Sequence, residues 1–592
     1  MTFRLLAIGL LALAPLDGSG AGMENPVRLA RDGWFRLADG ELFVPLGGFH
    51  GNVIPVSMLR LSPEEYRRVQ PHLWGAQKTA GLPHLDLYDA SEQMLQRWFR
   101  LLADNGVTAI RLFPRARVSA DVLDLCGKVN PDLQAVFRRA FAAARPYRIR
   151  FLLQILPEPP LTGYLNPEAL ERYVVPRYSP QELAELAPCQ RRFLVERKCV
   201  RLGEWFTDRE VLACQKLYLG QALEWVAREP QIFALEIYNE QGWNAAHVNG
   251  NTVRSFSDRE DIEIRWTAEM VKLIKQRLPE MPVCLSHAGF GVTGFDPLKW
   301  AKPAGVDFYS SHLYAGLVGD NASVDFATVT GATGLIVSAG RVNWPGEWGI
   351  FDSPVPADLK RFSHRDAIWL SLLARQPGFL QWTYEFPDEY RRVSEIVRAL
   401  PKRFSPASPE LTVEIGAEYR DFHTHTRYPA FSIDKPFPAF EYNRQKQADE
   451  NIQRIYRAYQ RSLEIGVPIR FVMGQRDGIS LERFAALDAA RLPRPIRAVG
   501  GYQLAYMKDA NSATWIAYLR KRVVKGFGRH FVGVPEQAPL RIQVDLPKGR
   551  YLARLMDLGA NTMRRYDLGA RSRIEVAKRT SADYVLVITR RD

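Results

Sequence analysis

The chain has 592 residues, of which 46% are hydrophobic and 24% charged. This length is too great for one ordinary domain, and the composition excludes a disordered chain. The net charge of +14 is uneven, because residues 501–592 contain eighteen Lys and Arg against eight Asp and Glu. Such a basic tail is either a solvated surface or a surface that faces an acidic polysaccharide.

Residues 1–22 are typical of a secretory signal peptide. Arg4 precedes an apolar run from Leu5 to Leu16, and small residues follow it. The run is too short to cross a bilayer. We therefore expect a secreted or periplasmic protein, with a retained N-terminal anchor as the alternative. The five cysteines show no metal-ligand spacing, and Cys189 could pair with Cys199 in an oxidising compartment.

The chain from 33 to 404 alternates short apolar runs with amphipathic segments. The apolar runs are typical of β-strands and end near residue 50 or occupy 107–113, 149–156, 232–238, 282–289, 306–314, 341–347 and 378–386. Helical periodicity lies between them at 89–106, from 131 onward, and at 207–228, 257–278, 364–376 and 386–404. This α/β alternation predicts a (β/α)8 TIM barrel. A Pro-rich insertion at 157–206 is expected to wall its mouth.

The pattern changes after residue 404. Residues 405–500 mix helices with a strand and predict a connecting α/β segment. Residues 501–592 consist of short alternating runs separated by turns, which predicts an antiparallel β-sandwich.

Two carboxylates stand at the ends of predicted barrel strands. Asn239 and Glu240 directly follow the fourth strand, and Glu347 closes the seventh. Barrel enzymes carry their catalytic groups at this rim. Retaining hydrolysis of a glycosidic bond needs one carboxylic acid and one carboxylate, about 5 to 5.5 Å apart. Taken singly, either glutamate could equally be a solvated loop residue or a helix cap.

The Asn-Glu pair after strand four and Glu347 in WPGEWG after strand seven resemble the clan A glycoside hydrolases. These are retaining glycosidases on a (β/α)8 barrel, and the resemblance is strongest to families 5 and 39. It covers roughly residues 33–404. It implies that Glu240 is the general acid/base and Glu347 the nucleophile. It further implies that Arg111 keeps the nucleophile ionised and that Asn239 binds the sugar 2-hydroxyl.

The same resemblance extends to other strand ends. His312 and Tyr314 match the His-x-Tyr of the clan, with Tyr314 touching the nucleophile and His312 lining the sugar site or, alternatively, lying in the core. Trp382 matches the platform tryptophan that stacks on a sugar ring. Further candidate sugar contacts at or near predicted strand ends are Trp243, Trp344, Trp348, His50, His287 and Glu385.

The sequence has no Walker loop, no H-E-x-x-H and no G-x-S-x-G elbow, and no G-x-G-x-x-G follows a strand. No cofactor, metal, nucleic-acid partner or membrane contact beyond the signal peptide is therefore expected. The prediction is an exported retaining β-glycosidase that acts on a poly- or oligosaccharide. One alternative is a barrel that binds polysaccharide without catalysis, and another is a transglycosylase that uses the same site.

Overall fold

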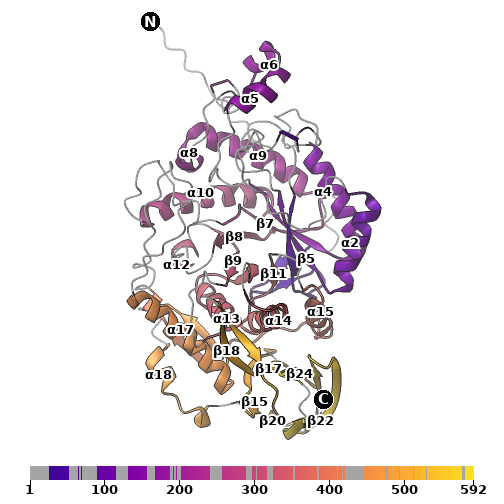
Figure 1. Ribbon diagram of the computed structural model, residues 1–592, viewed down its shortest axis with the longest axis vertical. Helices are drawn as coiled ribbons and strands as arrows, with labels where there is room; N and C mark the ends of the chain where they lie inside the picture. The colour runs from indigo at the N-terminus through magenta and orange to yellow at the C-terminus, as the bar shows by residue number, and fades with distance from the viewer. Residues whose placement is uncertain are drawn as a thin grey trace.

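A computed structural model gives the arrangement of the chain (Figure 1). The structure describes residues 26–52, 65, 68–69, 90–114, 131–156, 167–186, 191, 195–196, 202–240, 256–288, 297–301, 303, 305–315, 324–350, 354–382, 386–409, 411–416, 418–419, 446–473, 478–492, 494–510, 513–527, 530–576 and 581–591. The predicted signal peptide lies outside these residues, as do residues 157–166, 187–190, 192–194 and 197–201 of the Pro-rich insertion.

An eight-stranded parallel sheet forms the centre of the larger part of the chain. Its strands are β4 (Leu46–Asn52), β5 (Ala109–Pro114), β6 (Arg150–Gln154), β7 (Ile232–Glu236), β8 (Val283–Ala288), β9 (Phe308–Tyr314), β10 (Asn343–Gly349) and β11 (Phe379–Gln381). Neighbours pair in the order β10-β9-β8-β7-β6-β5-β4-β11. The sheet closes where the Trp382 amide donates to the Trp348 carbonyl at 3.0 Å. The predicted (β/α)8 barrel is therefore confirmed.

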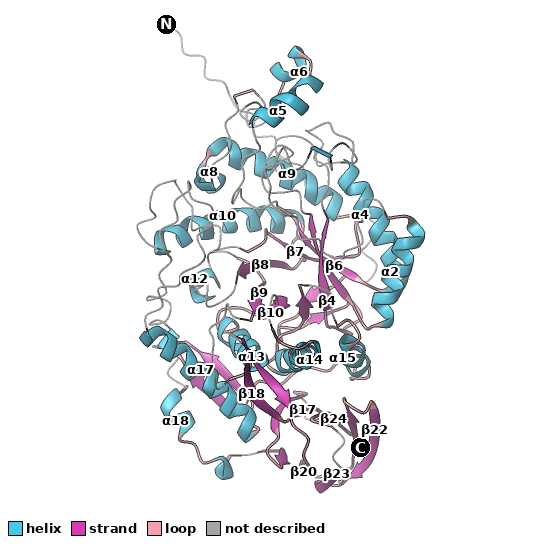
Figure 2. Cartoon of the chain, in the orientation of Figure 1, coloured by secondary structure: helices cyan, strands magenta, loops and turns pink. Residues whose placement is uncertain are grey.

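Helices surround this barrel (Figure 2). The long ones are α2 (Glu92–Asp104), α4 (Pro131–Ala144), α9 (Arg209–Val226), α10 (Phe256–Arg277), α13 (Phe326–Val337), α14 (Ala357–Leu373) and α15 (Glu389–Arg398). Shorter ones are α5 (Pro167–Tyr173), α6 (Pro180–Ala184), α8 (Leu202–Thr207) and α12 (Pro297–Ala301), with 3₁₀ turns at Arg145–Tyr147 and Val175–Arg177. Within the described ranges, none of the helices combines the length and apolar character that crossing a bilayer requires.

The local sequence explains where the helices begin and which face they bury. Asp208 caps α9 by accepting hydrogen bonds from the amides of Glu210 and Val211. Helix α2 buries Leu95 and Phe99, which are four residues apart and therefore share one face.

A short antiparallel sheet of β1 (Arg28–Leu29), β2 (Phe35–Arg36) and β3 (Leu42–Phe43) covers one end of the barrel. Phe35 inserts between Phe233 of β7 and Phe308 of β9, with ring centroids 5.6 and 5.2 Å away. Trp344 of β10 joins this cluster and is fully buried. This aromatic plug fills the amino-terminal end of the barrel, which we call its floor. A functional site is therefore expected at the opposite, carboxyl-end rim.

Strand β10 contains a proline, which cannot donate a ladder hydrogen bond. The strand accommodates it because the pairing with β9 shifts register between Pro345 and Glu347. Gly346 lies in this shift, and a Cβ atom there would stand 1.7 Å from the Ser310 hydroxyl oxygen. The Pro-Gly-Glu sequence thus forms a β-bulge, and its central position has room only for glycine.

The segment after the barrel is an α/β unit, as predicted. Parallel strands β12 (Leu411–Glu414), β13 (Ile469–Val472) and β14 (Ile479–Ser480) pair in the order β13-β12-β14. Helices α17 (Lys446–Ile465) and α18 (Leu481–Ala485) accompany them, and a 3₁₀ turn follows at Ala489–Arg491.

Two antiparallel sheets make up the C-terminal part. One contains β15 (Ile496–Val499), β20 (Leu540–Asp545) and β23 (Arg571–Val576), and the other contains β16 (Gln503–Lys508), β17 (Thr514–Arg520), β24 (Asp583–Arg590), β21 (Tyr551–Asp557) and β22 (Thr562–Leu568). Strands β18 (Arg522–Phe527) and β19 (His530–Pro535) form a hairpin. Apolar side chains of the two sheets pack together, as a sandwich requires. Because β15 pairs with β20, the sandwich begins slightly before residue 501.

Helices α13 and α14 lie between the barrel and the C-terminal strands (Figure 1). Every residue of α13 is buried. At this junction Arg520 of β17 pairs with Asp325 at 2.9 Å and with Asp366 at 3.0 Å, and Arg522 also pairs with Asp366, at 2.7 Å. All of these groups are buried. Buried charges need such partners, so the C-terminal strands are a fixed part of the molecule.

Candidate active site

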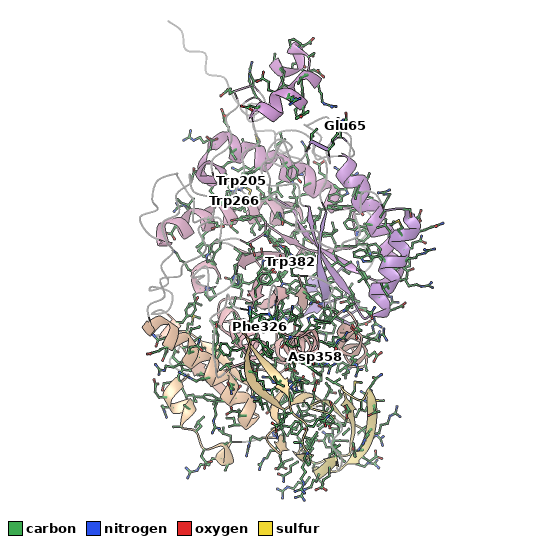
Figure 3. All side chains as sticks on the ribbon, in the orientation of Figure 1. Glu65, Trp205, Trp266, Phe326, Asp358 and Trp382 are labelled. Atoms are coloured by element: carbon green, nitrogen blue, oxygen red, sulfur yellow. The ribbon has the colours of Figure 1, made fainter. Side chains whose placement is uncertain are left out.

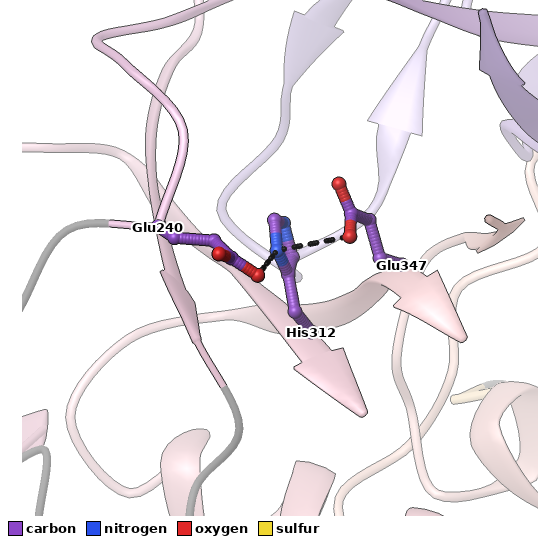
Figure 4. Close-up of side chains that lie close together, drawn as sticks. All are labelled: Glu240, His312 and Glu347. Atoms are coloured by element: carbon purple, nitrogen blue, oxygen red, sulfur yellow. Dashed lines mark hydrogen bonds and ion pairs between the residues drawn. The ribbon is translucent and has the colours of Figure 1, made fainter. Parts of the chain in front are cut away.

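The two predicted catalytic carboxylates lie together at the carboxyl-end rim of the barrel (Figure 4). One oxygen of Glu240, one oxygen of Glu347 and a ring nitrogen of His312 all lie within 4.8 Å of one another. His312 stands between the glutamates, with Nδ1 3.1 Å from Glu240 Oε1 and 3.3 Å from Glu347 Oε2. The side chain of Glu240 is 25% exposed, whereas that of Glu347 is 1% exposed. The two groups therefore share a site but have unlike surroundings.

Glu240 is held by an unusual backbone conformation. Its φ is +53°, in the left-handed region that residues with side chains rarely adopt. The Glu240 amide donates to the Ser286 hydroxyl at 2.9 Å, and that hydroxyl donates to the Tyr238 carbonyl at 3.1 Å. Backbone strain of this kind persists where neighbours fix it, and it gathers at functional sites.

Arg111 of β5 connects the groups beneath the rim. Its Nε and Nη2 donate to the two carboxylate oxygens of Glu236 at 2.5 and 2.7 Å. Nη2 also donates to Asn239 Oδ1 at 2.6 Å, and Nη1 donates to Glu347 Oε1. Burial alone would lower the pKa of Arg111, but the charges of Glu236 and Glu347 outweigh it and hold the pKa above its usual value. The guanidinium is therefore permanently charged.

Glu347 accepts hydrogen bonds from Arg111 and from the Tyr314 hydroxyl. Burial raises the pKa of Glu347 above its ordinary value, while Arg111 and Tyr314 oppose the rise. Burial also lowers the pKa of His312 to about 4, so its ring is neutral at neutral pH. The carboxyl group of Glu347 thus lies beside a cation, Arg111, and a neutral imidazole.

Glu240, His312 and Glu347 are also residue types that bind metals, and their spacing would suit an ion. Both oxygens of Glu347, however, already accept hydrogen bonds from Arg111 and Tyr314. A divalent cation here would stand beside the buried guanidinium and be repelled by it. The arrangement fits acid/base and nucleophilic chemistry better than a metal centre.

Trp382 lies at the end of β11, near the centre of the barrel region (Figure 3). Its ring is 6.4 Å from that of Tyr314, and the two planes meet at 81°. Since Tyr314 contacts Glu347, this places the partly exposed indole beside that carboxyl group. The position suits the predicted platform for a sugar ring.

Three predicted sugar contacts, Trp348, His287 and Trp344, are contradicted by their positions. Trp348 is buried, stacks on Phe326 at 5.3 Å, and donates its indole N–H to Thr330 of α13. Its ring therefore packs against the helix layer. His287 is fully buried and hydrogen-bonds Ser311 at 2.9 Å. Alternation along β8 places it on the opposite face from Ser286, which holds the Glu240 backbone.

Three other predicted contacts are not placed. Trp243 and Glu385 lie outside the described residues, and so does the side chain of His50. Trp344 belongs to the aromatic plug of the floor and has no exposed face.

Glu236 belongs to the site but is absent from the sequence-based predictions. It is the last residue of β7, lies within the apolar run 232–238 and is fully buried. The signal was available, since a charged residue in an otherwise apolar strand is costly unless it is paired. The same reasoning applies to Arg111 of β5, and the two residues are partners.

No family model matches the sequence, and no curated protein has a significantly similar sequence. Among solved structures, the fold is similar to that of an exo-β-1,4-mannosidase from Opitutaceae bacterium strain TAV5 (13% identity, 87% of this chain and 92% of that chain, TM-score 0.45). It is also similar to GH5_18 from Streptomyces cattleya in complex with GlcNAc (13%, 75% and 100%, 0.45). A third similar structure is a glycoside hydrolase family 5 protein from Bacteroides vulgatus ATCC 8482 (9%, 95% and 93%, 0.43). The chemistry of the site is therefore inferred from its own residues.

Proposed function

We propose that the protein is an exported retaining β-glycosidase that hydrolyses O-glycosidic bonds of an oligo- or polysaccharide by double displacement. The observation that carries the proposal is the approach of Glu240 and Glu347 to within 4.8 Å, oxygen to oxygen, at the rim of the barrel. Retaining enzymes keep their two carboxyl groups about 5 to 5.5 Å apart, and inverting enzymes need about 6.5 to 9.5 Å to admit a water.

The surroundings of the two carboxyl groups assign their roles. Glu347 is paired with Arg111, and this cation favours the ionised form that an attacking group needs. Glu240 is partly exposed, so it can reach a leaving oxygen and later a water molecule. Asn239 is fixed through its Oδ1 by Arg111, which directs its Nδ2 donor elsewhere and suits a bond to the sugar 2-hydroxyl.

In the first step an oxygen of Glu347 attacks the anomeric carbon, and the bond from that carbon to the leaving oxygen breaks. Glu240 gives its proton to the leaving oxygen, and the sugar is now an ester of Glu347. In the second step Glu240 takes a proton from water as the water oxygen attacks the same carbon. The ester bond breaks, and Glu347 is a carboxylate again.

The proposal is tested by offering the protein a panel of aryl β-glycosides, β-mannosides and β-glucosides included, and β-linked polysaccharides. The expected result is turnover of at least one substrate, with the β-anomer formed first in an NMR time course. First formation of the α-anomer would show inversion and contradict the mechanism. Negligible turnover of the whole panel would favour a binding protein. Transfer to an added sugar acceptor in place of water would identify a transglycosylase.

Export rests on a separate observation. Cys214 of α9 is disulfide-bonded. Disulfides persist in oxidising compartments, which supports a secreted or periplasmic location. The basic C-terminal strands add a reason to include an acidic polysaccharide in the panel, because Arg554 and Arg565 face each other directly across β21 and β22. Like charges directly opposite each other repel, and an anionic ligand bound between them would relieve that repulsion.

The pH dependence of kcat/KM follows from the raised pKa of Glu347. The attacking form is the carboxylate, so activity is present above this pKa and is lost as pH falls through it. We expect the acidic limb to lie above about 4.3, the ordinary value for a glutamate. His312 does not set this limb, because burial lowers its pKa to about 4. A pH profile of kcat/KM with an activated aryl glycoside checks this, and a limb below pH 4 would contradict it.

A further inference from the structure

Glu236 has no role in the two steps above, yet it is bound to Arg111 by two hydrogen bonds. Both side chains have no exposed surface. Glu236 engages Arg111 through both carboxylate oxygens, at 2.5 and 2.7 Å, whereas Glu347 offers the guanidinium one oxygen. A buried guanidinium held by two parallel hydrogen bonds is fixed in orientation as well as in charge.

The charge around Arg111 changes during the proposed reaction. In the resting site one guanidinium faces two carboxylates, Glu236 and Glu347. When Glu347 becomes a glycosyl ester it loses its negative charge. A buried cation without a counterion is strongly unfavourable, so the intermediate needs a second anion that takes no part in the chemistry.

The other described groups around Arg111 and Glu347 cannot supply that anion. Burial raises the pKa of Tyr314 and also that of the Cys284 thiol, so both are neutral. His312 is a neutral ring, and Asn239 carries no charge. Glu240 lies near the rim against His312 and passes through its acid form in each cycle. Among these groups, Glu236 is the carboxyl group that takes no part in the chemistry and is bound to Arg111 through both oxygens.

We propose that Glu236 is a positioning residue that serves as the permanent counterion of Arg111, so that the guanidinium stays paired while Glu347 is esterified. The inference rests on the proposed function. It distinguishes two carboxylates on one arginine: Glu347 is paired with Arg111 only between turnovers, and Glu236 is paired with it throughout. Glu236 thereby stabilises the glycosyl-enzyme. It also weakens the attraction between Arg111 and the carboxylate of Glu347.

Glu236→Gln removes the charge and keeps the shape, and Glu236→Asp keeps the charge. With the Gln variant, Arg111 is unpaired in the glycosyl-enzyme, so we expect that intermediate to be shorter-lived. Labelling with 2-deoxy-2-fluoro-β-glycosyl fluorides and following reactivation by mass spectrometry should give a lifetime about tenfold shorter than in the wild type. Because Arg111 then acts on Glu347 alone, the acidic limb of kcat/KM should also move to lower pH by about one unit. The Asp variant should keep both values near those of the wild type.

A purely structural role for Glu236 predicts a different result. The Gln variant would lose kcat by one factor at every pH, with an unchanged lifetime and an unchanged limb, and this result would overturn the proposal. If the Gln variant does not fold, Arg111→Met and Arg111→Met/Glu236→Met replace it. The glycosyl-enzyme should then have the same lifetime in the double variant as in Arg111→Met, because Glu236 no longer has a cation to pair with. A double variant whose glycosyl-enzyme lifetime is about a further tenfold shorter would overturn the proposal. A wild type that neither turns over nor becomes labelled would instead refute the glycosidase function itself.

Discussion

Replacement of Glu347 by Gln is expected to lower kcat/KM by about 10⁴-fold or more, because the amide cannot form the ester intermediate. The change is nearly isosteric, and Arg111 keeps its pair of hydrogen bonds to Glu236. Loss of activity should therefore come without loss of structure. Hydrolysis of an aryl β-glycoside, with thermal unfolding measured in parallel, checks both expectations.

Glu395→Gln is a matched control for this variant, since Glu395 is an exposed residue of α15 away from the barrel rim. It should retain the wild-type rate. Glu347→Gln with a rate within tenfold of the wild type would mean that another group attacks the sugar, and the assignment of the nucleophile would have to be abandoned.

Replacement of Glu240 by Ala is expected to have an effect that depends on the leaving group. Phenyl glycosides need a proton on the departing oxygen, so their kcat/KM should fall by about 10² to 10⁴-fold. Dinitrophenyl glycosides leave without one, so their first step should change little. The measurement is kcat/KM for a series of aryl glycosides of increasing leaving-group acidity, in wild type and variant.

The slope of log kcat/KM against leaving-group pKa should be much steeper for the Glu240 variant than for the wild type. Equal loss on every substrate would remove Glu240 from the acid role and leave it as a binding residue. The basic limb of the pH profile should also disappear in the variant, because it reports the acid form of the proton donor.

The sequence was sufficient for the barrel because its strands are short apolar runs ended by polar residues. Helix α13 was not predicted for a physical reason. All of its residues are buried between the barrel and the C-terminal strands, so it has no polar face and no helical periodicity to detect. The pairing of Arg520 with Asp325 and Asp366 was equally hidden, because it joins residues far apart in the chain.

At the site, the structure brings the predicted residues Glu240, His312 and Glu347 together, and it differs from the prediction where the direction of a side chain decides its position. Successive residues of a strand point to opposite faces. The register shift in β10 makes this alternation unreadable from the sequence, and Trp344 accordingly faces the barrel floor while Trp348 faces α13. The pairing of Arg111 with Glu236 joins two strands that are not neighbours in the sheet.

The most direct test of the account is to identify the residue that carries the sugar. The wild type is incubated with a 2-deoxy-2-fluoro-β-glycosyl fluoride of an accepted sugar, digested and mapped by tandem mass spectrometry. We expect one added sugar, located on the peptide that contains Glu347. A label on any other residue, or an active enzyme that never accumulates a label, would contradict it.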